Sequence, residues 1–184
     1  MKQRGFTLLA SLIFLVLLTI LGISMFGGFS QDELMSGNMR EKARALDSAQ
    51  ILLNDAQSWL VANTYSGGSN WNEGQACSAM TAIIVAGASK PIVCNDAISN
   101  ATTTPWTGFY MDKTPSGMGV SASGGKDKYA ASPSYYIQYI GKSINVPPGG
   151  IYKVTATGQG GNSNAVAVVE AVYEVTAISN DLTP

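Results

Sequence analysis

The longest hydrophobic run in the chain lies at its beginning. Residues 1–5 carry two basic side chains, Lys2 and Arg4, and residues 6–29 contain no charge. A helix over residues 6–29 would be about 36 Å long at 1.5 Å per residue, enough to cross a hydrocarbon core of about 30 Å. In lipid this segment must be helical, because every backbone amide needs an internal partner. The pattern therefore predicts a single transmembrane helix, with Lys2 and Arg4 on the cytoplasmic side and the rest of the chain exported.

A cleaved secretory signal peptide is the competing interpretation of this segment. The apolar region of such a peptide is shorter and ends in small residues at a cleavage site. The stretch Ile23–Gly27 matches such a site poorly. We therefore expect the apolar segment to remain in the mature protein.

The helical pattern continues through residues 30–64, where apolar and charged positions separate onto two faces. Apolar residues recur there with a three-four spacing that is broken at Lys42. They are Met35, Met39, Leu46, Ala49, Leu53, Ala56 and Leu60. The charged face carries Asp32, Glu33, Arg40, Glu41, Arg44, Asp47 and Asp55. The apolar stripe predicts that the later part of this helix packs on a globular domain formed by residues 65–184.

The last fifty residues change to the pattern of β-strands. Residues 134–141, 150–158 and 165–175 are rich in β-branched and aromatic side chains and are separated by glycine or proline. This predicts three strands of an antiparallel meander. Between helix and strands we expect a short helix over residues 75–86 and a long irregular region, with aromatic residues set into it: Trp71, Trp106, Phe109, Tyr110 and Met111. The predicted fold class is α+β, a long N-terminal helix packed on an antiparallel sheet with the irregular region inserted.

The two cysteines, Cys77 and Cys94, lie in this inserted region. They are even in number and fall in the exported part, so we expect them to form a disulfide. Such a bridge closes a loop of about seventeen residues and stabilises by about 3 kcal/mol on the loop-entropy model. A metal pair is the alternative, although two thiolates supply only two ligands.

Composition excludes several classes of chemistry. Eleven Lys and Arg stand against twelve Asp and Glu, so the chain has no basic footprint for nucleic acid. Histidine is absent, which rules out Ser-His and Cys-His nucleophiles and histidine metal ligands.

The glycine-rich stretch 158–161 joins two predicted strands, so it is expected to be a hairpin turn and not a phosphate loop. Asn95, Asp96, Asp112 and Asp127 are interpreted either as solvated loop residues or as ligands of a calcium site. We predict no catalytic residues, no metal and no cofactor.

The residues at the start of the apolar segment resemble a known family. The sequence Arg4-Gly5-Phe6-Thr7-Leu8-Leu9 resembles the leader junction of type IV pilins and pseudopilins. The resemblance implies that residues 1–5 are a leader, that prepilin peptidase cuts between Gly5 and Phe6, and that Phe6 is then N-methylated. A generic transmembrane anchor is the alternative.

One position departs from the major-pilin pattern. The fifth residue after the implied cut, usually a glutamate, is Ala10. A carboxylate there would neutralise the terminal amine of a neighbouring subunit, and an unpaired buried charge is costly. A subunit without it is poorly suited to joining beneath another subunit. Ala10 therefore predicts a role in initiation or at the filament tip.

Three later stretches resemble minor pilins of the PilX type. They are residues 33–41 (ELMSGNMRE), the alanine-rich run 45–56, and residues 152–158 (YKVTATG) before a glycine-rich turn. Leu46 stands where an aromatic is common in that family. The resemblance implies a structural minor pilin that helps to initiate assembly, held by one span in the inner membrane with its C-terminus periplasmic and later placed on the cell-surface pilus. It also implies several partners: other minor pilins, the major pilin, a large tip adhesin and prepilin peptidase.

Two further interpretations stay open from the sequence. One is the tip pseudopilin of a type II secretion system, which also lacks the glutamate. The other is a membrane-anchored binding or adhesion module that uses Trp71, Trp106 and Tyr110 as its ligand surface. Cleavage at Gly5 is expected of the pilin interpretations and not of the binding module.

Overall fold

The computed structural model describes residues 4–64, 72–78, 91–98, 100–102, 111–145 and 148–176. The chain divides into two compact units, Met1–Arg40 and Glu41–Pro184. Each unit is described by itself below.

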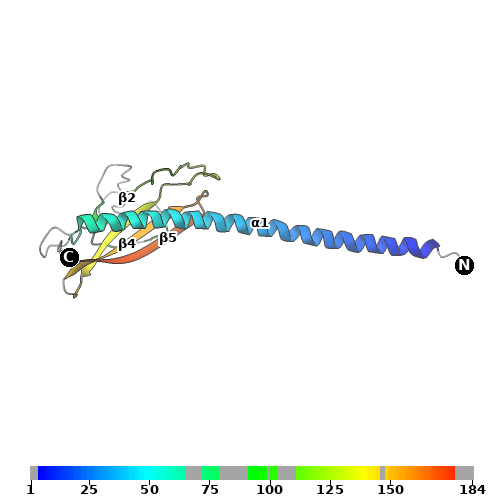
Figure 1. The fold of residues 1–184 in the computed structure, drawn as a ribbon, viewed down its shortest axis with the longest axis horizontal. Coiled ribbons are helices and arrows are strands. Elements are labelled where there is room, and N and C mark those ends of the chain that lie inside the picture. Colours follow the sequence, from blue (N-terminus) through cyan, green and yellow to red (C-terminus); the bar gives the residue numbers. More distant parts are fainter. Residues whose placement is uncertain are drawn as a thin grey trace, which may run out of the picture. The chain divides into compact units, whose positions relative to one another are not determined.

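One continuous helix, α1, spans Arg4–Asn63 and contributes to both units (Figure 1). It covers the predicted apolar segment and the predicted extension, and it continues through Gly27 and Gly28. Among the described residues, α1 is the one helix long and apolar enough to cross a membrane, judged by length and composition. α1 ends at Asn63, and the next residue, Thr64, caps it. The backbone N–H and the hydroxyl of Thr64 both donate to the carbonyl of Leu60, at 3.1 and 2.6 Å. The carbonyl of Leu60, near the end of the helix, therefore has hydrogen-bond donors.

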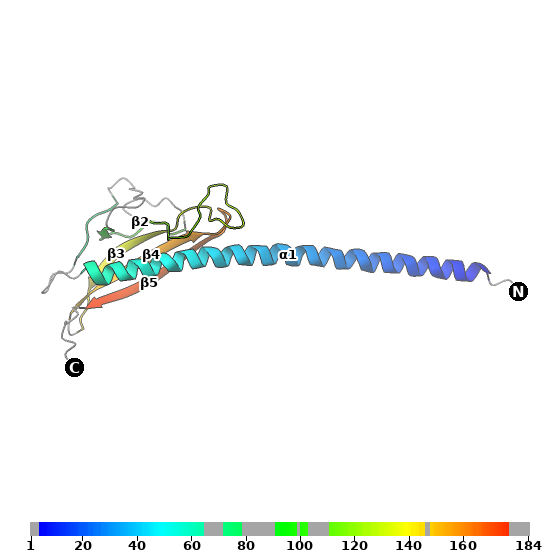
Figure 2. The ribbon, with the colours of Figure 1, turned by 45° about the horizontal axis from the view of Figure 1, so that its top comes forward.

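The sheet of the second unit is built around three long strands, β3 (Ser134–Lys142), β4 (Gly149–Gln159) and β5 (Val166–Thr176). β3 pairs with β4 and β4 with β5, both antiparallel, as the alternating pattern predicted. Two short strands were not predicted: β1 (Val93–Cys94) runs parallel to β3, and β2 (Met111–Asp112) runs antiparallel to it. The sheet is therefore mixed, with β3 receiving β1 and β2 and with β5 at the other end of the strand order β1-β3-β4-β5 (Figure 2). The predicted α+β class, with a long N-terminal helix followed by a C-terminal sheet, is confirmed.

The core lies between the second half of α1 and one face of this sheet. From the helix come Leu52, Ala56 and Leu60, all at most 1% exposed. The sheet side contributes Val93, Tyr135, Ile137, Tyr152, Val154, Ala156 and Val175. The predicted helix face is thus correct for Ala56 and Leu60, and Leu53 is partly buried.

Nearer its start in this unit, the buried helix face differs from the predicted one. Ala49 is fully buried as predicted, but Leu46 is 43% exposed, and Ala45 and Ser48, which were not in the predicted stripe, are fully buried. The reason is the close approach of β4. A Cβ added at Gly158 would lie 2.0 Å from Ser48 Oγ, 2.5 Å from Ala45 O and 2.7 Å from Ala49 N. Small residues on the helix and a glycine on the strand bring the two backbones together, so a larger side chain such as Leu46 lies outside the contact.

A polar cluster joins the start of this helix half to two loops. Glu41 accepts a hydrogen bond from the backbone N–H of Gly161. Arg44 donates to Glu41 at 3.2 Å and to the carbonyl of Lys128 at 2.7 Å, and its guanidinium lies 4.8 Å from the ring centre of Tyr129. These contacts bind the segment 113–133 and the β4–β5 turn to α1. We call Glu41, Arg44, Tyr129 and Gly161 the loop clamp.

The predicted short helix over residues 75–86 is wrong at its beginning. Gln75 forms a parallel bridge with Cys94, in which Gln75 N donates to Val93 O and Asn95 N donates to Gln75 O, both at 3.0 Å. Residues 79–86 lie outside the described residues. Trp71, Trp106, Phe109 and Tyr110 lie outside them as well, whereas Met111 is half-buried in β2.

Candidate functional site

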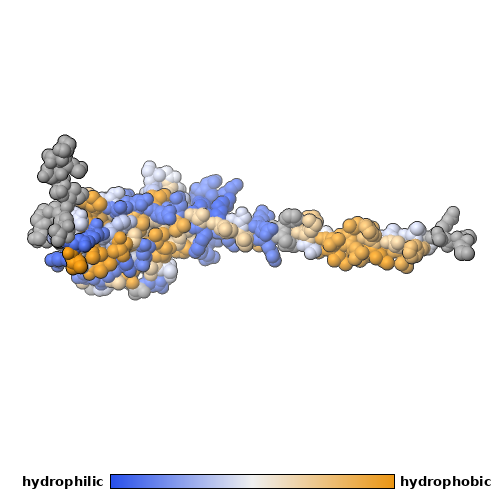
Figure 3. Space-filling view, turned by 60° about the horizontal axis from the view of Figure 1, so that its bottom comes forward, coloured by the Kyte–Doolittle hydropathy of each residue, from blue (hydrophilic) through white to orange (hydrophobic). Residues whose placement is uncertain are grey.

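The earlier part of the first unit presents an almost entirely apolar helix surface. No residue in the most apolar window of α1 is buried within the chain, and no charged residue occurs between Phe6 and Phe26. Phe6 is 76% exposed and Phe26 77%. On the face seen in Figure 3, apolar side chains predominate over this part of the helix. We call residues 6–26 the stem. A surface of this extent needs lipid or an apolar protein partner to cover it.

Two hydroxyl side chains of the stem, Ser11 and Thr19, find partners within the helix. Ser11 Oγ donates to the carbonyl of Leu8 at 2.9 Å, and Thr19 Oγ1 donates to that of Val16 at 2.7 Å. Hydroxyls in helices commonly bond back to a preceding carbonyl in this way. These two hydroxyl donors therefore need no partner outside the helix, which suits an apolar surrounding.

Ala10, the position that lacks the usual glutamate, lies near the beginning of the stem. It is exposed and lines a shallow apolar depression along the helix together with Ser11, Phe14, Leu15 and Leu18. Because the stem carries no carboxylate, it offers no counter-charge to an amine placed against it. The depression suits an apolar side chain from a neighbouring helix.

The predicted cleavage junction lies at the start of α1. Gly5 and Phe6 are both exposed and both helical. A Cβ added at Gly5 would meet no atom within 4 Å. The folded chain therefore places no steric demand for glycine at this position, and cleavage after Gly5 and methylation of Phe6 stay predictions.

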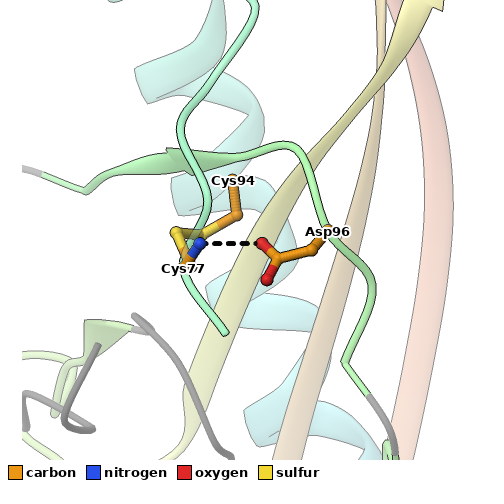
Figure 4. A group of neighbouring side chains, drawn as sticks. All are labelled: Cys77, Cys94 and Asp96. Carbon is orange, nitrogen blue, oxygen red and sulfur yellow. Dashed lines mark hydrogen bonds between the residues drawn. A yellow bond between two sulfur atoms is a disulfide. The ribbon is translucent and has the colours of Figure 1, made fainter. Parts of the chain in front are cut away.

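In the second unit, Cys77 and Cys94 form the predicted disulfide (Figure 4). Their Cα atoms are 5.5 Å apart, and both residues are fully buried. The bond joins the segment 72–78 to β1, beside the bridge between Gln75 and Cys94. It therefore fastens a chain segment without regular structure to the edge of the sheet.

Asp96 lies beside the disulfide and completes this arrangement. Its carboxylate accepts hydrogen bonds from the backbone N–H groups of Cys77, at 2.9 Å, and of Ser78. Tyr136 donates its hydroxyl to the carbonyl of Asp96 at 2.8 Å. Partial burial raises the pKa of Asp96, but the hydrogen bonds from Cys77 and Ser78 outweigh it and hold the pKa below its usual value.

This arrangement does not fit the alternative of a metal site. Within the described residues, one group of three potential ligands comes close together, and it is Cys77, Cys94 and Asp96. Both sulfurs are consumed by the disulfide, so neither is available as a thiolate. The Asp96 carboxylate is directed at backbone amides. The described residues also do not bring Asp112 or Asp127 into such a group, so the calcium alternative gains no support.

Burial shifts the pKa of two further titratable groups in the sheet, Tyr152 and Asp112. Burial raises the pKa of Tyr152 to about 12, so its phenol is neutral and donates to the carbonyl of Asn72 at 3.1 Å. Burial also raises the pKa of Asp112, and its Oδ1 is the one buried side-chain oxygen or nitrogen without a partner in the part of the chain described. The glycine-rich stretch is a hairpin turn, as predicted: Gly160 N donates to Ala165 O at 2.8 Å.

A family model described as "Type IV pilus assembly protein PilX C-term" matches residues 63–175, more than half of the chain. The match begins where α1 ends and covers the disulfide segment and the sheet through Val175. Searches among curated proteins and among solved structures found no significant match.

Proposed function

Since the chain belongs to the PilX family of type IV pilus assembly proteins and has a minor pilin role in the pilus, we propose that it initiates filament assembly and stays at or near the filament tip. Its role in this proposal is structural and involves no catalysis. Before assembly it is a single-pass protein of the bacterial inner membrane with a periplasmic C-terminus. Its partners are other minor pilins, the major pilin and a large tip adhesin.

The observation that carries the tip position is Ala10. A subunit added beneath another one places its stem against the positively charged terminal amine of the earlier subunit. The stem of this chain has no carboxylate to receive that charge. In an apolar filament interior the unpaired amine would be strongly unfavourable. Within a growing filament, the first position does not require the missing carboxylate, because no earlier subunit's amine has to be met.

The proposed place of the subunit at the filament tip is tested by immunogold labelling of the wild-type subunit on pili, and by deleting its gene. Labels at one end, together with fewer filaments of normal structure in the deletion strain, are expected. Labels spread evenly along the shaft would show that the tip assignment is wrong.

Ala10→Glu and Ala10→Gln form a matched pair of similar size for testing the role of charge. The glutamate variant should enter the shaft, since its carboxylate can meet a terminal amine, and the glutamine variant should not. If Ala10 were an ordinary membrane residue, the glutamate would instead oppose insertion by about 2.5–3.5 kcal/mol at mid-bilayer. In that case the protein would be lost from the membrane and no shaft labelling would appear.

Processing by prepilin peptidase is tested separately at Gly5. Intact-mass analysis of the protein from a peptidase-positive cell should show a chain beginning at Phe6 with one added methyl group. Gly5→Val should block the cut, and the space around Gly5 means that this variant should fold normally. Unprocessed wild-type protein in purified pili would contradict the pilin processing pathway.

A further inference from the structure

Among the described residues, β5 has a neighbouring strand on one side only. β4 pairs with it over eleven residue pairs, from Gly149–Thr176 to Gln159–Val166, without a register shift. β5 is the last strand in the order of the sheet, and Figure 2 shows it as the outermost arrow. The result is a long and regular sheet edge.

The hairpin turn identifies which backbone groups face this edge. Gly160 N donates to Ala165 O at 2.8 Å, so this pair is of the hydrogen-bonded type. Bonded and non-bonded pairs alternate along antiparallel strands. Residues 167, 169, 171, 173 and 175 therefore bond to β4, and the even-numbered residues direct their N–H and C=O groups to the free edge. Consistent with this, Lys42 Nζ donates to the carbonyl of Val166 at 2.6 Å. In the described structure, Lys42 covers the end of the edge nearest the hairpin turn. The edge-facing N–H and C=O groups of residues 168, 170, 172 and 174 have no hydrogen-bond partner among the described residues.

Natural sheet edges are usually protected by proline, inward-directed lysine or a bulge. β5 has neither proline nor lysine, and its pairing with β4 contains no bulge. The even-numbered side chains lie on the sheet face opposite the core, where Glu170 and Glu174 flank Val172. Both glutamates are exposed, and Val172 is 60% exposed. Each glutamate also has a partner within the chain: Glu170 lies 3.3 Å from Lys153 Nζ, and Glu174 accepts hydrogen bonds from the side chain of Asn145 at 2.8 and 2.9 Å. The edge therefore combines unpaired backbone groups with an acid–apolar–acid row of side chains.

We propose that the free edge of β5 binds an extended strand of a partner protein in which two basic side chains flank an apolar one at two-residue spacing. Strand addition of this kind uses main-chain hydrogen bonds for affinity and alternate side chains for selectivity. A basic residue opposite Glu170 and another opposite Glu174 give favourable cross-strand pairs, which add to the contacts of these glutamates with Lys153 and Asn145, and an apolar residue lies opposite Val172. A second copy of β5 fits less well, because the strand carries no basic residue to oppose these glutamates. This inference concerns the sheet and goes beyond the proposed role in initiation.

The test uses the full chain in detergent and a fluorescently labelled seven-residue peptide. The peptide has threonine at each end, lysine at its second and sixth positions and three valines between them. Fluorescence anisotropy should show salt-sensitive binding at peptide concentrations up to about 1 mM. Absence of binding over this range would overturn the proposal. A peptide with glutamate in place of both lysines should bind at least tenfold more weakly.

Two controls separate strand addition from simple charge attraction. N-methylating the peptide amides that face β5 removes hydrogen-bond donors without changing charge, and should weaken binding at least tenfold. On the protein side, Val172→Pro removes an N–H from the free edge while leaving the bonds to β4, and edge strands tolerate proline there. Its matched control is Val172→Thr, which keeps the N–H and should therefore bind the peptide more tightly than Val172→Pro does. Equal binding of methylated and unmethylated peptides would overturn the proposal, as would self-association of the wild type that excludes the peptide.

Discussion

Replacing Gly158 by alanine tests the close contact between α1 and β4. The added methyl carbon would lie 2.0 Å from Ser48 Oγ, 2.5 Å from Ala45 O and 2.7 Å from Ala49 N. Carbon atoms normally stay more than 3 Å from such neighbours. Two of these three atoms belong to the helix backbone, so rotating a side chain cannot relieve the contact. The helix must shift away from the strand.

The expected cost follows from this geometry. Overpacking a well-filled core by one methyl group costs about 1–3 kcal/mol. The distances place Gly158→Ala at the upper end, while lower entropy of the unfolded chain returns about 0.5–1 kcal/mol. We therefore expect a loss of about 2 kcal/mol in the free energy of unfolding. Gly158 does not have a positive φ, so backbone strain adds nothing to this value.

Urea unfolding of the full chain in detergent, followed by tryptophan fluorescence, measures this loss, because Trp59 packs against the core. Gly141→Ala is the matched control: Gly141 lies in β3, and a Cβ there meets nothing within 4 Å. The control should match the wild type or be slightly more stable. Adding Ser48→Ala to Gly158→Ala should restore only part of the stability, because Ala45 O and Ala49 N remain in place. Equal stability of Gly158→Ala and Gly141→Ala would refute the close contact.

Three further predictions concern the second unit. Cys94→Ser should lower the free energy of unfolding by about 3 kcal/mol in urea melts, because the disulfide closes a loop of 17 residues; an unchanged midpoint would contradict this. Asp96 has a folded pKa below its unfolded value of about 4, so its stabilising effect is present above pH 4 and is lost as the pH falls through the folded pKa. Asp96→Asn should therefore be less stable than the wild type at pH 7, with the difference shrinking in melts below pH 4; a difference that grows on acidification would contradict the assignment. Arg44→Lys should cost about 1–2 kcal/mol by thermal or urea unfolding, since lysine keeps the charge but cannot both stack on Tyr129 and donate to several acceptors; a neutral result would show that charge alone suffices.

The long elements of the fold were predictable because their periodicity extends over many residues. Charge-free length identified the stem, and runs of β-branched and aromatic residues separated by glycine or proline identified β3, β4 and β5. The two-residue strands β1 and β2 are too short to show a period. They exist because β3 offers them an edge, which is a property of the folded sheet and not of their own sequences.

The buried helix face was predicted incorrectly at Leu46 because hydrophobicity was weighed above size. What decides the contact is the pairing of Ala45, Ser48 and Ala49 with Gly158, more than one hundred positions later. A run of small residues on one helix face was the available signal. It identifies a close contact only when its glycine partner is known.

The candidate site was predictable to different degrees. The disulfide followed from an even cysteine count in an exported segment, whereas the role of Asp96 depends on amides that the disulfide positions. Gly5, Phe6 and Ala10 act through a peptidase and neighbouring subunits in the proposed function. A single folded chain does not contain those partners, so these three positions remain predictions.

The position of the loop clamp has a mechanical consequence. Tension along α1 enters the second unit at Glu41, the first residue of that unit, and the bond of Glu41 to Gly161 lies there together with the contacts of Lys42 and Arg44. These polar contacts would take up load before the apolar contacts near Leu60. Pulling along the helix shears the small-residue contact with β4, and shearing strains many contacts together instead of opening them one at a time. The clamp would thus keep a pulled helix attached to its sheet.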